Sequence, residues 1–369
     1  MSKNFFRKLF SRDPQLSFFA WQVELTTRCP LRCRMCVRDS SPDWVSADMP
    51  IDNFRKLSPY FEKVKNVVLE GWGEPLLYND LPEAVRIVKE AGAQAGFVTS
   101  GWGLDRTRIA HLIEAGLDFI GFSLAGATPA THQAIRIHSD FPTVIQAIQD
   151  VNRIKADRKL ERPNLHIVFL MLRDNFSEIP LLLDLAKEVG IRVIVLINLA
   201  QVTNAWQNNQ KVFTCNPEEE DLLFREAEIK AKELEIILKK PGLSPEIIDV
   251  CEEDPLRNLY ISVDGQVAPC VFLYPPAPSP ITRIFCGREQ AIEKVSFGNI
   301  FNEPLEQIWN NPVYAAFREK LNRRKKKFAE RYSLTAARTL DTKSLQKSGE
   351  TALPDFPEPC RTCHRMLGL

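Results

Sequence analysis

Hydrophobic positions in the first two-thirds of the chain form two kinds of segment. Short apolar runs are typical of buried strands, and longer segments with an apolar residue every three or four positions are typical of helices. The expected strands are Trp21–Leu25, Val64–Glu70, Gly96–Thr99, Phe119–Leu124, Leu165–Met171 and Val193–Ile197. The expected helices are Asp52–Tyr60, Leu81–Ala91, Asp105–Ala115, Val144–Ala156 and Ile179–Val189.

The order of these elements indicates the fold class. Strands that alternate with helices at intervals of roughly 25–30 residues are typical of βα units and a parallel sheet. A complete eight-fold barrel needs about 250 residues, whereas the six units found here lie within residues 19–215. We therefore predict an α/β protein with a partial (β/α)6 TIM-like barrel.

The last third of the chain has a different pattern. A long charged helix is expected over Glu218–Lys240, and a hairpin over Leu259–Ala268 with Asp264-Gly265 at its turn. A further helix is expected over Pro304–Leu321. The expected organisation is an N-terminal extension (1–18), the barrel (19–215), a linker helix (216–250) and a small C-terminal α+β domain (251–369).

Composition narrows the class of protein. The 48 basic and 47 acidic residues give a net charge of +1, so no nucleic-acid partner is expected. The longest apolar stretch, Val193–Ala200, is shorter than the roughly 20 residues that span a bilayer, so no stable membrane insertion is expected. Met1–Pro14 has no long apolar region and does not resemble a cleaved secretory signal. We expect a cytoplasmic protein.

The nine cysteines carry the chemical information. Clustered cysteines in a long cytosolic chain more often bind metal or do redox chemistry than form disulfides, and an odd number argues against a complete disulfide framework. Cys215 and Cys286 have no partner at metal-binding spacing and are expected to be core or loop thiols, although Cys286 could substitute as a ligand. The other seven are Cys29, Cys33, Cys36, Cys251, Cys270, Cys360 and Cys363.

Cys29, Cys33 and Cys36 form a C-x3-C-x2-C motif directly after the first expected strand. Ligands bind at this end of parallel sheets. Three thiolates on one loop can hold three irons of a [4Fe–4S] cluster and leave the fourth iron open, as in catalytic metal sites. The alternative is a zinc loop with a distant fourth ligand. Basic residues that would favour thiolates are Arg28, Arg32, Arg34 and Arg38.

The segment Glu70-Gly71-Trp72-Gly73-Glu74-Pro75 follows the second expected strand. Its glycines let the backbone approach a ligand closely, and a carboxylate can accept hydrogen bonds from an ammonium group. The alternative is an ordinary loop between a strand and a helix.

Together the two motifs resemble those of the radical S-adenosylmethionine (SAM) superfamily. The resemblance implies that SAM chelates the open iron and is reductively cleaved to a 5′-deoxyadenosyl radical, which abstracts a substrate hydrogen. Gly71, Gly73 and Glu74 match the family's loop for the SAM amino group. Met35 stands where the family usually has an aromatic residue near the adenine.

Weaker matches to the family lie at the ends of later strands. The resemblance implies SAM contacts for Ser100 and a ribose contact for Ser123, although Ala125 replaces the usual acidic residue two positions on. Arg136 matches an arginine near the SAM carboxylate, with a surface salt bridge as the alternative. Asn198 is expected to face the adenine.

The C-terminal cysteines form a third pattern. Cys251 and Cys270 are spaced C-x13-G-x4-C, and Cys360 and Cys363 are spaced C-x2-C. Four cysteines can ligate a second [4Fe–4S] cluster. The pattern resembles a SPASM domain in its shortened "twitch" form, with a zinc site as the alternative. His364 adjoins this pair and could hydrogen-bond the cluster.

The resemblance and the second cluster imply oxidative modification or maturation of a peptide, a partner protein or a cofactor precursor. A flavodoxin or ferredoxin is the expected reductant. One alternative is a radical SAM dehydrogenase of a small molecule such as an aminocyclitol. Another is a non-catalytic iron–sulfur protein that transfers electrons or serves as a scaffold.

Overall fold

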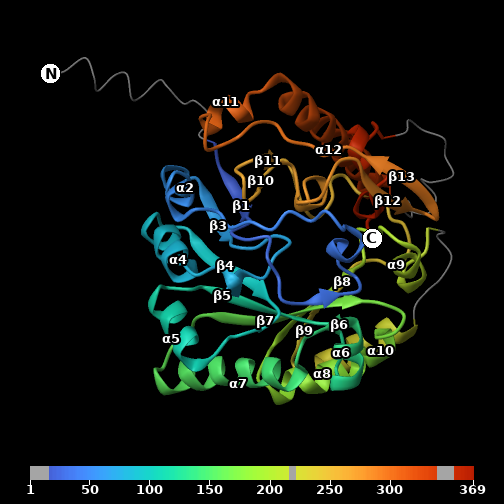
Figure 1. The fold of residues 1–369 in the computed structure, drawn as a ribbon. Coiled ribbons are helices and arrows are strands. Elements are labelled where there is room, and N and C mark those ends of the chain that lie inside the picture. Colours follow the sequence, from blue (N-terminus) through green and yellow to red (C-terminus); the bar gives the residue numbers. More distant parts are fainter. Residues whose placement is uncertain (1–15, 216–221, 339–352) are drawn as a thin grey trace.

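The computed structural model describes residues 16–215, 222–338 and 353–369. Its main feature is a nine-stranded sheet that curves as an open barrel with helices on its outer face (Figure 1). In sheet order the strands are β11 (Val267–Ala268), β10 (Asn258–Ile261), β1 (Phe18–Val23), β3 (Val64–Val68), β4 (Gln94–Thr99), β5 (Phe119–Leu124), β7 (Asn164–Met171), β8 (Val193–Asn198) and β9 (Ile237–Lys239).

The six expected strands are confirmed as β1, β3, β4, β5, β7 and β8, and they pair in parallel. Helices follow most of them. These helices are α2 (Ile51–Arg55), α3 (Ser58–Phe61), α4 (Leu81–Glu90), α5 (Arg106–Glu114), α6 (Pro129–Ile135), α7 (Phe141–Asp157), α8 (Ile179–Glu188) and α9 (Ala205–Gln210). The helices α5, α6, α7 and α9 begin at side-chain caps such as Asp105, which accepts a hydrogen bond from the Arg108 amide.

Three expected helices differ from the structure. The segment Asp52–Tyr60 is divided into α2 and α3, because Pro59 has no amide hydrogen and belongs in the first turn of a helix. Pro312 likewise divides Pro304–Leu321 into α11 (Leu305–Trp309) and α12 (Pro312–Arg338). The helix expected over Glu218–Lys240 is wrong at its end, since α10 (Leu222–Glu233) is followed by β9; its first residues, 218–221, lie outside the described residues.

Both edges of the sheet extend beyond the six expected strands. At one edge β9 pairs in parallel with β8, with Val193 opposite Ile237. At the other edge β10 pairs in parallel with β1, so a strand from the C-terminal region continues the barrel wall. The expected hairpin is confirmed as β10 and β11, and Gly265 at its turn has a φ of +82°.

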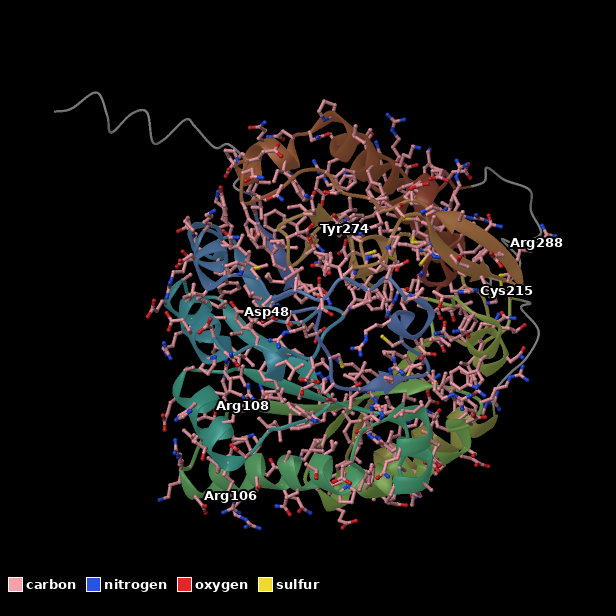
Figure 2. All side chains as sticks on the ribbon, viewed as in Figure 1. Asp48, Arg106, Arg108, Cys215, Tyr274 and Arg288 are labelled. Atoms are coloured by element: carbon pink, nitrogen blue, oxygen red, sulfur yellow. A yellow bond between two sulfur atoms is a disulfide. The ribbon has the colours of Figure 1, made fainter. Side chains whose placement is uncertain are left out.

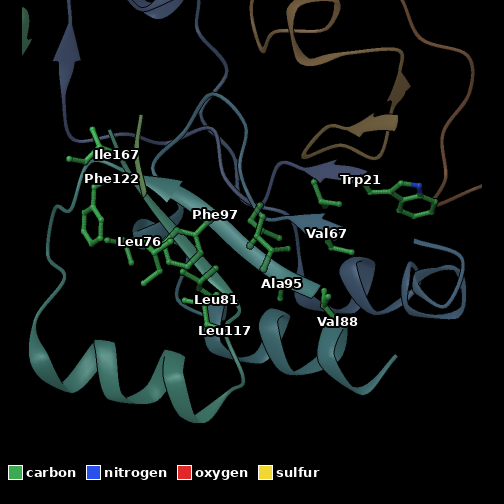
Figure 3. Close-up of a cluster of buried hydrophobic side chains, with 14 of the residues drawn as sticks. Trp21, Val67, Leu76, Leu81, Val88, Ala95, Phe97, Leu117, Phe122 and Ile167 are labelled. Atoms are coloured by element: carbon green, nitrogen blue, oxygen red, sulfur yellow. The ribbon is translucent and has the colours of Figure 1, made fainter. Parts of the chain in front are cut away.

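The main core fills the space between the outer face of the sheet and the surrounding helices. Figure 3 shows Val67, Ala95 and Phe97 of β3 and β4 facing Leu81 and Val88 of α4, and all five are fully buried. Side chains alternate across a strand. The neighbouring positions on β1 and β3 therefore face the barrel interior, where the candidate site lies.

The C-terminal region contains a second hairpin, β12 (Ile281–Phe285) and β13 (Arg288–Ile292), and three short 3-10 helices, η4 (Val271–Leu273), η5 (Glu358–Cys360) and η6 (His364–Leu367). In Figure 1 this region covers the β1 side of the barrel mouth. Within the described part of the chain, no helix combines the length and apolarity needed to cross a membrane.

Candidate functional site

The first three cysteines lie on one loop that leaves the carboxyl end of β1. Cys33 is in the short strand β2 (Arg32–Cys33), which pairs antiparallel with β6 (Arg136–Ile137) and places Cys33 opposite Arg136. The amide of Cys36 donates to the carbonyl of Cys33, 3.0 Å away, and closes a turn. The structure therefore brings the three thiols together on one folded loop.

A short helix that sequence reasoning missed supports this loop. From α9, the side-chain amide of Gln207 donates to the carbonyl oxygens of Arg34 and Cys36, both at 3.3 Å. The guanidinium of Arg34 lies 4.1 Å from the centre of the Trp206 ring. A polar residue in a short helix gives no distinctive sequence signal, so this contact could not be predicted.

The environment of the three thiols favours a metal. Burial raises the pKa of Cys29 to about 11 and that of Cys36 to about 12. The pKa of Cys33 is also raised by burial, although the positive charge of Arg136 opposes the rise. Thiolates form in such a place only when a cation compensates them, and three soft sulfur donors suit iron.

The glycine-rich loop packs directly on the cysteine loop. A Cβ atom on Gly73 would lie 2.2 Å from the carbonyl oxygen of Thr26, so only glycine fits there. The amide of Glu74 donates to the carbonyl of Arg28 at 2.8 Å. Gly71 is equally confined, because its Cβ would meet the side chain of Glu24 at 2.5 Å.

Glu74 and Ser100, both expected to contact SAM, bond to each other. One carboxylate oxygen of Glu74 accepts from the amide and hydroxyl of Ser100 at 2.8 and 2.6 Å. The other accepts from the Thr99 hydroxyl at 2.5 Å and the Leu76 amide at 3.1 Å. Glu74 thereby joins the ends of β3 and β4, and its direct contact with SAM stays a prediction.

Arg136 is buried and is not a surface salt bridge, which removes that alternative. It donates to the hydroxyl of Ser123 at the end of β5, and another guanidinium nitrogen lies 3.9 Å from the sulfur of Cys33. Its Nε has no hydrogen-bond partner. Two expected cofactor-binding residues are therefore joined to a cysteine of the motif.

Met35 and Asn198 lie beside the same loop. Met35 belongs to a small apolar cluster with Ala125, Leu172 and Leu199, which follow three neighbouring strands. Asn198 donates to the carbonyl of Gly242 at 2.9 Å, while its own Oδ1 is buried without a partner. The expected contacts of both residues with the adenine of SAM stay predictions.

The C-terminal cysteines converge from three distant segments. Cys251, Cys270, Cys360 and Cys363 line one pocket together with the guanidinium groups of Arg283 and Arg365. Burial, together with the neighbouring Glu253 and Cys363, raises the pKa of Cys251 to about 12. The four cysteines expected to ligate a second cluster therefore lie in one pocket, and their role as ligands stays a prediction.

Four cysteine sulfurs in one pocket suit two kinds of centre. One is a tetrahedral zinc ion with Zn–S bonds of about 2.3 Å. The other is a [4Fe–4S] cluster in which each sulfur binds a different iron.

A cavity of about 200 Å³ lies at strands β1, β3 and β10. Its wall includes Gln22, Glu70, Tyr260 and Cys270. Burial raises the pKa of Glu70 to about 7, although its carboxylate accepts a 2.7 Å hydrogen bond from the Val98 amide. Glu70 was quoted in the sequence motif without a role, because its orientation depends on the pairing of β3 and β4.

Cys215 and Cys286 are not unpaired thiols, contrary to expectation. They form a disulfide across 71 residues of sequence. Figure 2 shows Cys215 at the side of the β12–β13 hairpin that carries Arg288.

The expectation for His364 also needs correction, because its ring nitrogens contact the carbonyl of Ala200 and the amide of Cys286 instead of a cluster ligand.

Comparisons with known families agree with this geometry. The sequence model of the radical SAM superfamily matches residues 23–186. The model of the SPASM iron–sulfur cluster-binding domain matches residues 251–331. The first match contains the cysteine loop and the glycine-rich loop, and the second contains Cys251 and Cys270.

Two curated relatives cover most of the chain. One is the tungsten-containing aldehyde ferredoxin oxidoreductase cofactor-modifying protein of Pyrococcus furiosus, 26% identical over 300 residues, which are 80% of this chain and 82% of the relative. The other is the PqqA peptide cyclase of Methylobacterium sp. strain 4-46, 26% identical over 303 residues, or 80% of this chain and 74% of the relative. Both are similar in length as well as in sequence.

Solved structures support the fold. Streptococcus suis SuiB bound to the precursor peptide SuiA matches 96% of this chain and 71% of its own length with a TM-score of 0.60 and 15% identity. The protein anSMEcpe with bound AdoMet matches 81% of this chain and 82% of its own length with a TM-score of 0.55 and 13% identity. At such identities the likeness concerns the fold alone.

Proposed function

The chain belongs to the radical SAM superfamily and carries a SPASM domain, and from this premise we propose that it oxidatively modifies a peptide substrate. It is an enzyme that uses SAM, a SAM-coordinating [4Fe–4S] cluster and an auxiliary cluster. When bound, the first cluster supplies the electron that cleaves SAM to the 5′-deoxyadenosyl radical. The chain's own residues hold the cofactors, orient the substrate and exclude water.

For the SAM site we propose Cys29, Cys33 and Cys36 as the iron ligands. Three half-buried thiols on one loop, with the charge of Arg136 at 3.9 Å from one sulfur, support this assignment. The SAM molecule itself would lie between the glycine-rich loop and the apolar cluster of Met35. The residues proposed to line it are Gly71, Gly73, Glu74, Ser100, Ser123, Arg136 and Asn198.

For the auxiliary cluster we propose Cys251, Cys270, Cys360 and Cys363. Their common pocket and the match of residues 251–331 to an iron–sulfur cluster-binding domain support a cluster over zinc. Arg283 and Arg365 line the same pocket, and their charges would stabilise an anionic cluster. This assignment makes residues 251–369 the auxiliary domain and residues 19–215 the SAM domain, with 216–250 between them.

One observation carries the proposal of net oxidation. The indole of Trp72, in the glycine-rich loop, donates to the carbonyl of Val271, the residue after Cys270. The proposed SAM loop is therefore in direct contact with the loop that carries an auxiliary ligand. An auxiliary cluster so close to the SAM site would supply an electron acceptor, which favours net oxidation of a C–H position.

A peptide is the substrate class that the relatives favour. One relative is named a PqqA peptide cyclase, and SuiB was solved with a precursor peptide. The relative from Pyrococcus furiosus is named a cofactor-modifying protein, so a cofactor precursor is the second candidate. A small molecule such as an aminocyclitol is the remaining alternative, and a non-catalytic scaffold would consume no SAM.

The reconstituted enzyme tests these candidates directly. It would be incubated anaerobically with SAM, dithionite and a peptide extract from cells grown in deuterated medium. We expect deuterium to appear in 5′-deoxyadenosine, and we expect protease treatment of the extract to abolish the transfer. Transfer that resists protease would identify a small-molecule substrate, and a fully loaded protein that forms no 5′-deoxyadenosine would contradict the enzymatic proposal.

Two further assignments complete the proposal. We propose a flavodoxin or ferredoxin as the physiological reductant, because the first cluster requires single electrons at low potential. We also propose a cytoplasmic location, since the seven cysteines assigned to clusters must stay reduced before iron is inserted.

A further inference from the structure

A fully buried histidine lies beside the disulfide between Cys215 and Cys286. One ring nitrogen of His364 and the two sulfurs all lie within 4.8 Å of one another. The ring is held between Phe213 and Phe285, at centroid distances of 4.8 and 5.1 Å. The imidazole is thus fixed in place beside two sulfur atoms.

The contacts of His364 determine its tautomer. Its Nδ1 lies 3.2 Å from the carbonyl oxygen of Ala200, and a carbonyl only accepts, so Nδ1 carries the hydrogen. Its Nε2 accepts from the backbone amide of Cys286 at 3.3 Å, so the lone pair of Nε2 points toward Cys286. Metal-binding histidines commonly donate from one ring nitrogen to a backbone carbonyl in this way and bind the metal with the other. Here the Cys286 amide occupies the lone pair of Nε2 and would have to move away for a metal to bind.

Cys286 occupies a position that turn geometry alone does not explain. It is at the tip of the β12–β13 hairpin with a φ of +46°, a conformation that favours glycine or asparagine. Gly287 follows with a φ of +78°, and a Cβ there would meet no atom within 4 Å. The tip therefore has space to move when the sulfurs separate.

We propose that Cys215, Cys286 and His364 form a third metal site, for one zinc ion, that is controlled by thiol oxidation. A dithiol reductant would transfer two electrons and two protons to the disulfide, which gives two thiols and the disulfide of the reductant. Zinc would then displace both thiol protons and bind two thiolates and Nε2, with water as the fourth ligand. A disulfide oxidant would accept two electrons from the two thiolates, leaving as two thiolates of its own while the Cys215–Cys286 bond forms and the ion is released.

The location gives this site a structural consequence. His364 directly follows Cys363, and the buried guanidinium of Arg283 on β12 donates to the carbonyl of Pro359, next to Cys360. Zinc would therefore join the hairpin through a metal ligand to the segment that carries two cysteines of the auxiliary pocket. The disulfide joins the hairpin to Cys215 instead, and His364 then contacts the hairpin only through the Cys286 amide.

Zinc uptake by the holoenzyme tests the proposal. Reconstituted protein with both clusters would be reduced with dithiothreitol, desalted anaerobically, mixed with zinc sulfate and desalted again. Iron and zinc would then be measured by mass spectrometry. A diamide-oxidised sample and the variants Cys215→Ser, Cys286→Ser and Glu289→Ser would be treated in the same way; Glu289 is an exposed residue of the same hairpin.

We expect about one zinc per chain in the reduced wild type and in Glu289→Ser. Zinc should fall at least tenfold in the oxidised sample and in both cysteine variants, while iron stays unchanged. Equal zinc in a cysteine variant and the wild type, or no uptake by the reduced wild type, would overturn the proposal, as would equal uptake by the oxidised protein. Iron content and SAM cleavage are measured separately, so failure of this site is distinct from failure of the proposed function.

Discussion

The indole nitrogen of Trp72 donates a 3.2 Å hydrogen bond to the carbonyl oxygen of Val271. This contact joins two residues that are 199 positions apart and belong to the glycine-rich loop and the Cys270 loop. Trp72 also makes edge contacts with Trp44 and Phe272, at centroid distances of 6.2 and 6.1 Å. It is the direct link between the two candidate cofactor sites that the fold places beside each other.

Trp72→Phe should weaken this link moderately, and Trp72→Ala should weaken it more. Phenylalanine keeps the ring contacts but leaves the Val271 carbonyl without its donor, at a cost of about 1–3 kcal/mol. We expect the unfolding temperature of the reconstituted protein to fall by a few degrees in Trp72→Phe and further in Trp72→Ala. Calorimetric scans that do not distinguish either variant from the wild type would show that the contact contributes nothing.

Arg136→Gln should impair the reduction of the first cluster. The guanidinium is buried next to the Cys33 sulfur, and loss of its positive charge disfavours an added electron. We expect a more negative reduction potential and about tenfold slower SAM cleavage, equivalent to the loss of one charge-assisted hydrogen bond. Arg32→Gln is the matched control, because Arg32 is exposed on the same short strand. Equal potentials in Arg136→Gln and the wild type would contradict the assignment of Cys33.

Glu74→Gln and Thr99→Val should both weaken SAM binding. Glutamine keeps one acceptor oxygen, so part of the bonding to Thr99, Ser100 and Leu76 is lost. We expect at least tenfold weaker binding for Glu74→Gln and a smaller loss for Thr99→Val, measured by titration calorimetry with SAM. Thr99 bonds to Glu74 and is not assigned to SAM. Unchanged binding in Thr99→Val would therefore show that Glu74 acts by direct contact and not by positioning the loop.

Glu24 should make stability depend on pH. Burial raises its pKa to about 7, although it accepts a 2.8 Å hydrogen bond from the Trp72 amide. Because the folded protein binds this proton more tightly than the unfolded chain, the contribution is fully present below the ordinary glutamate pKa. It is lost as the pH rises toward 7, by on the order of 3 kcal/mol.

Glu24→Gln removes the titrating group and tests this directly. The fall in unfolding temperature between about pH 5 and pH 8 should be smaller than in the wild type. Glu90→Gln, at an exposed position of α4, is the control and should keep the wild-type profile. A Glu24→Gln profile parallel to that of the wild type would show that Glu24 is ionised in the folded protein.

Local sequence was enough to predict the barrel strands and both cysteine motifs. Each expected strand is a short apolar run. Cys29, Cys33 and Cys36 are close neighbours in sequence on one loop, so their spacing can be recognised without the fold. The edge strand β9 was missed, because Ile237–Lys239 continues a charged helical segment and becomes a strand only by pairing with β8. Tertiary pairing of this kind overrides local propensity.

Contacts between distant segments could not be predicted. The disulfide joins Cys215 to Cys286 across 71 residues, and spacing alone does not specify such a pairing. The bonds between Glu74 and Ser100 depend on the register of β3 and β4, which places the two strand ends side by side. The sequence identified Glu74 and Ser100 as candidate site residues. Which hydrogen bonds the carboxylate oxygens of Glu74 accept could be seen only in the folded structure.

Iron content tests the central claim most directly. The reconstituted wild type would be compared with a triple variant, Cys29→Ala with Cys33→Ala and Cys36→Ala, and with a double variant, Cys360→Ala with Cys363→Ala. Two clusters predict about eight irons per chain in the wild type and about four in each variant, with SAM cleavage abolished in the triple variant and retained in the double one. About four irons in the wild type, falling to none in the triple variant and unchanged in the double variant, would contradict an auxiliary cluster at the C-terminal cysteines.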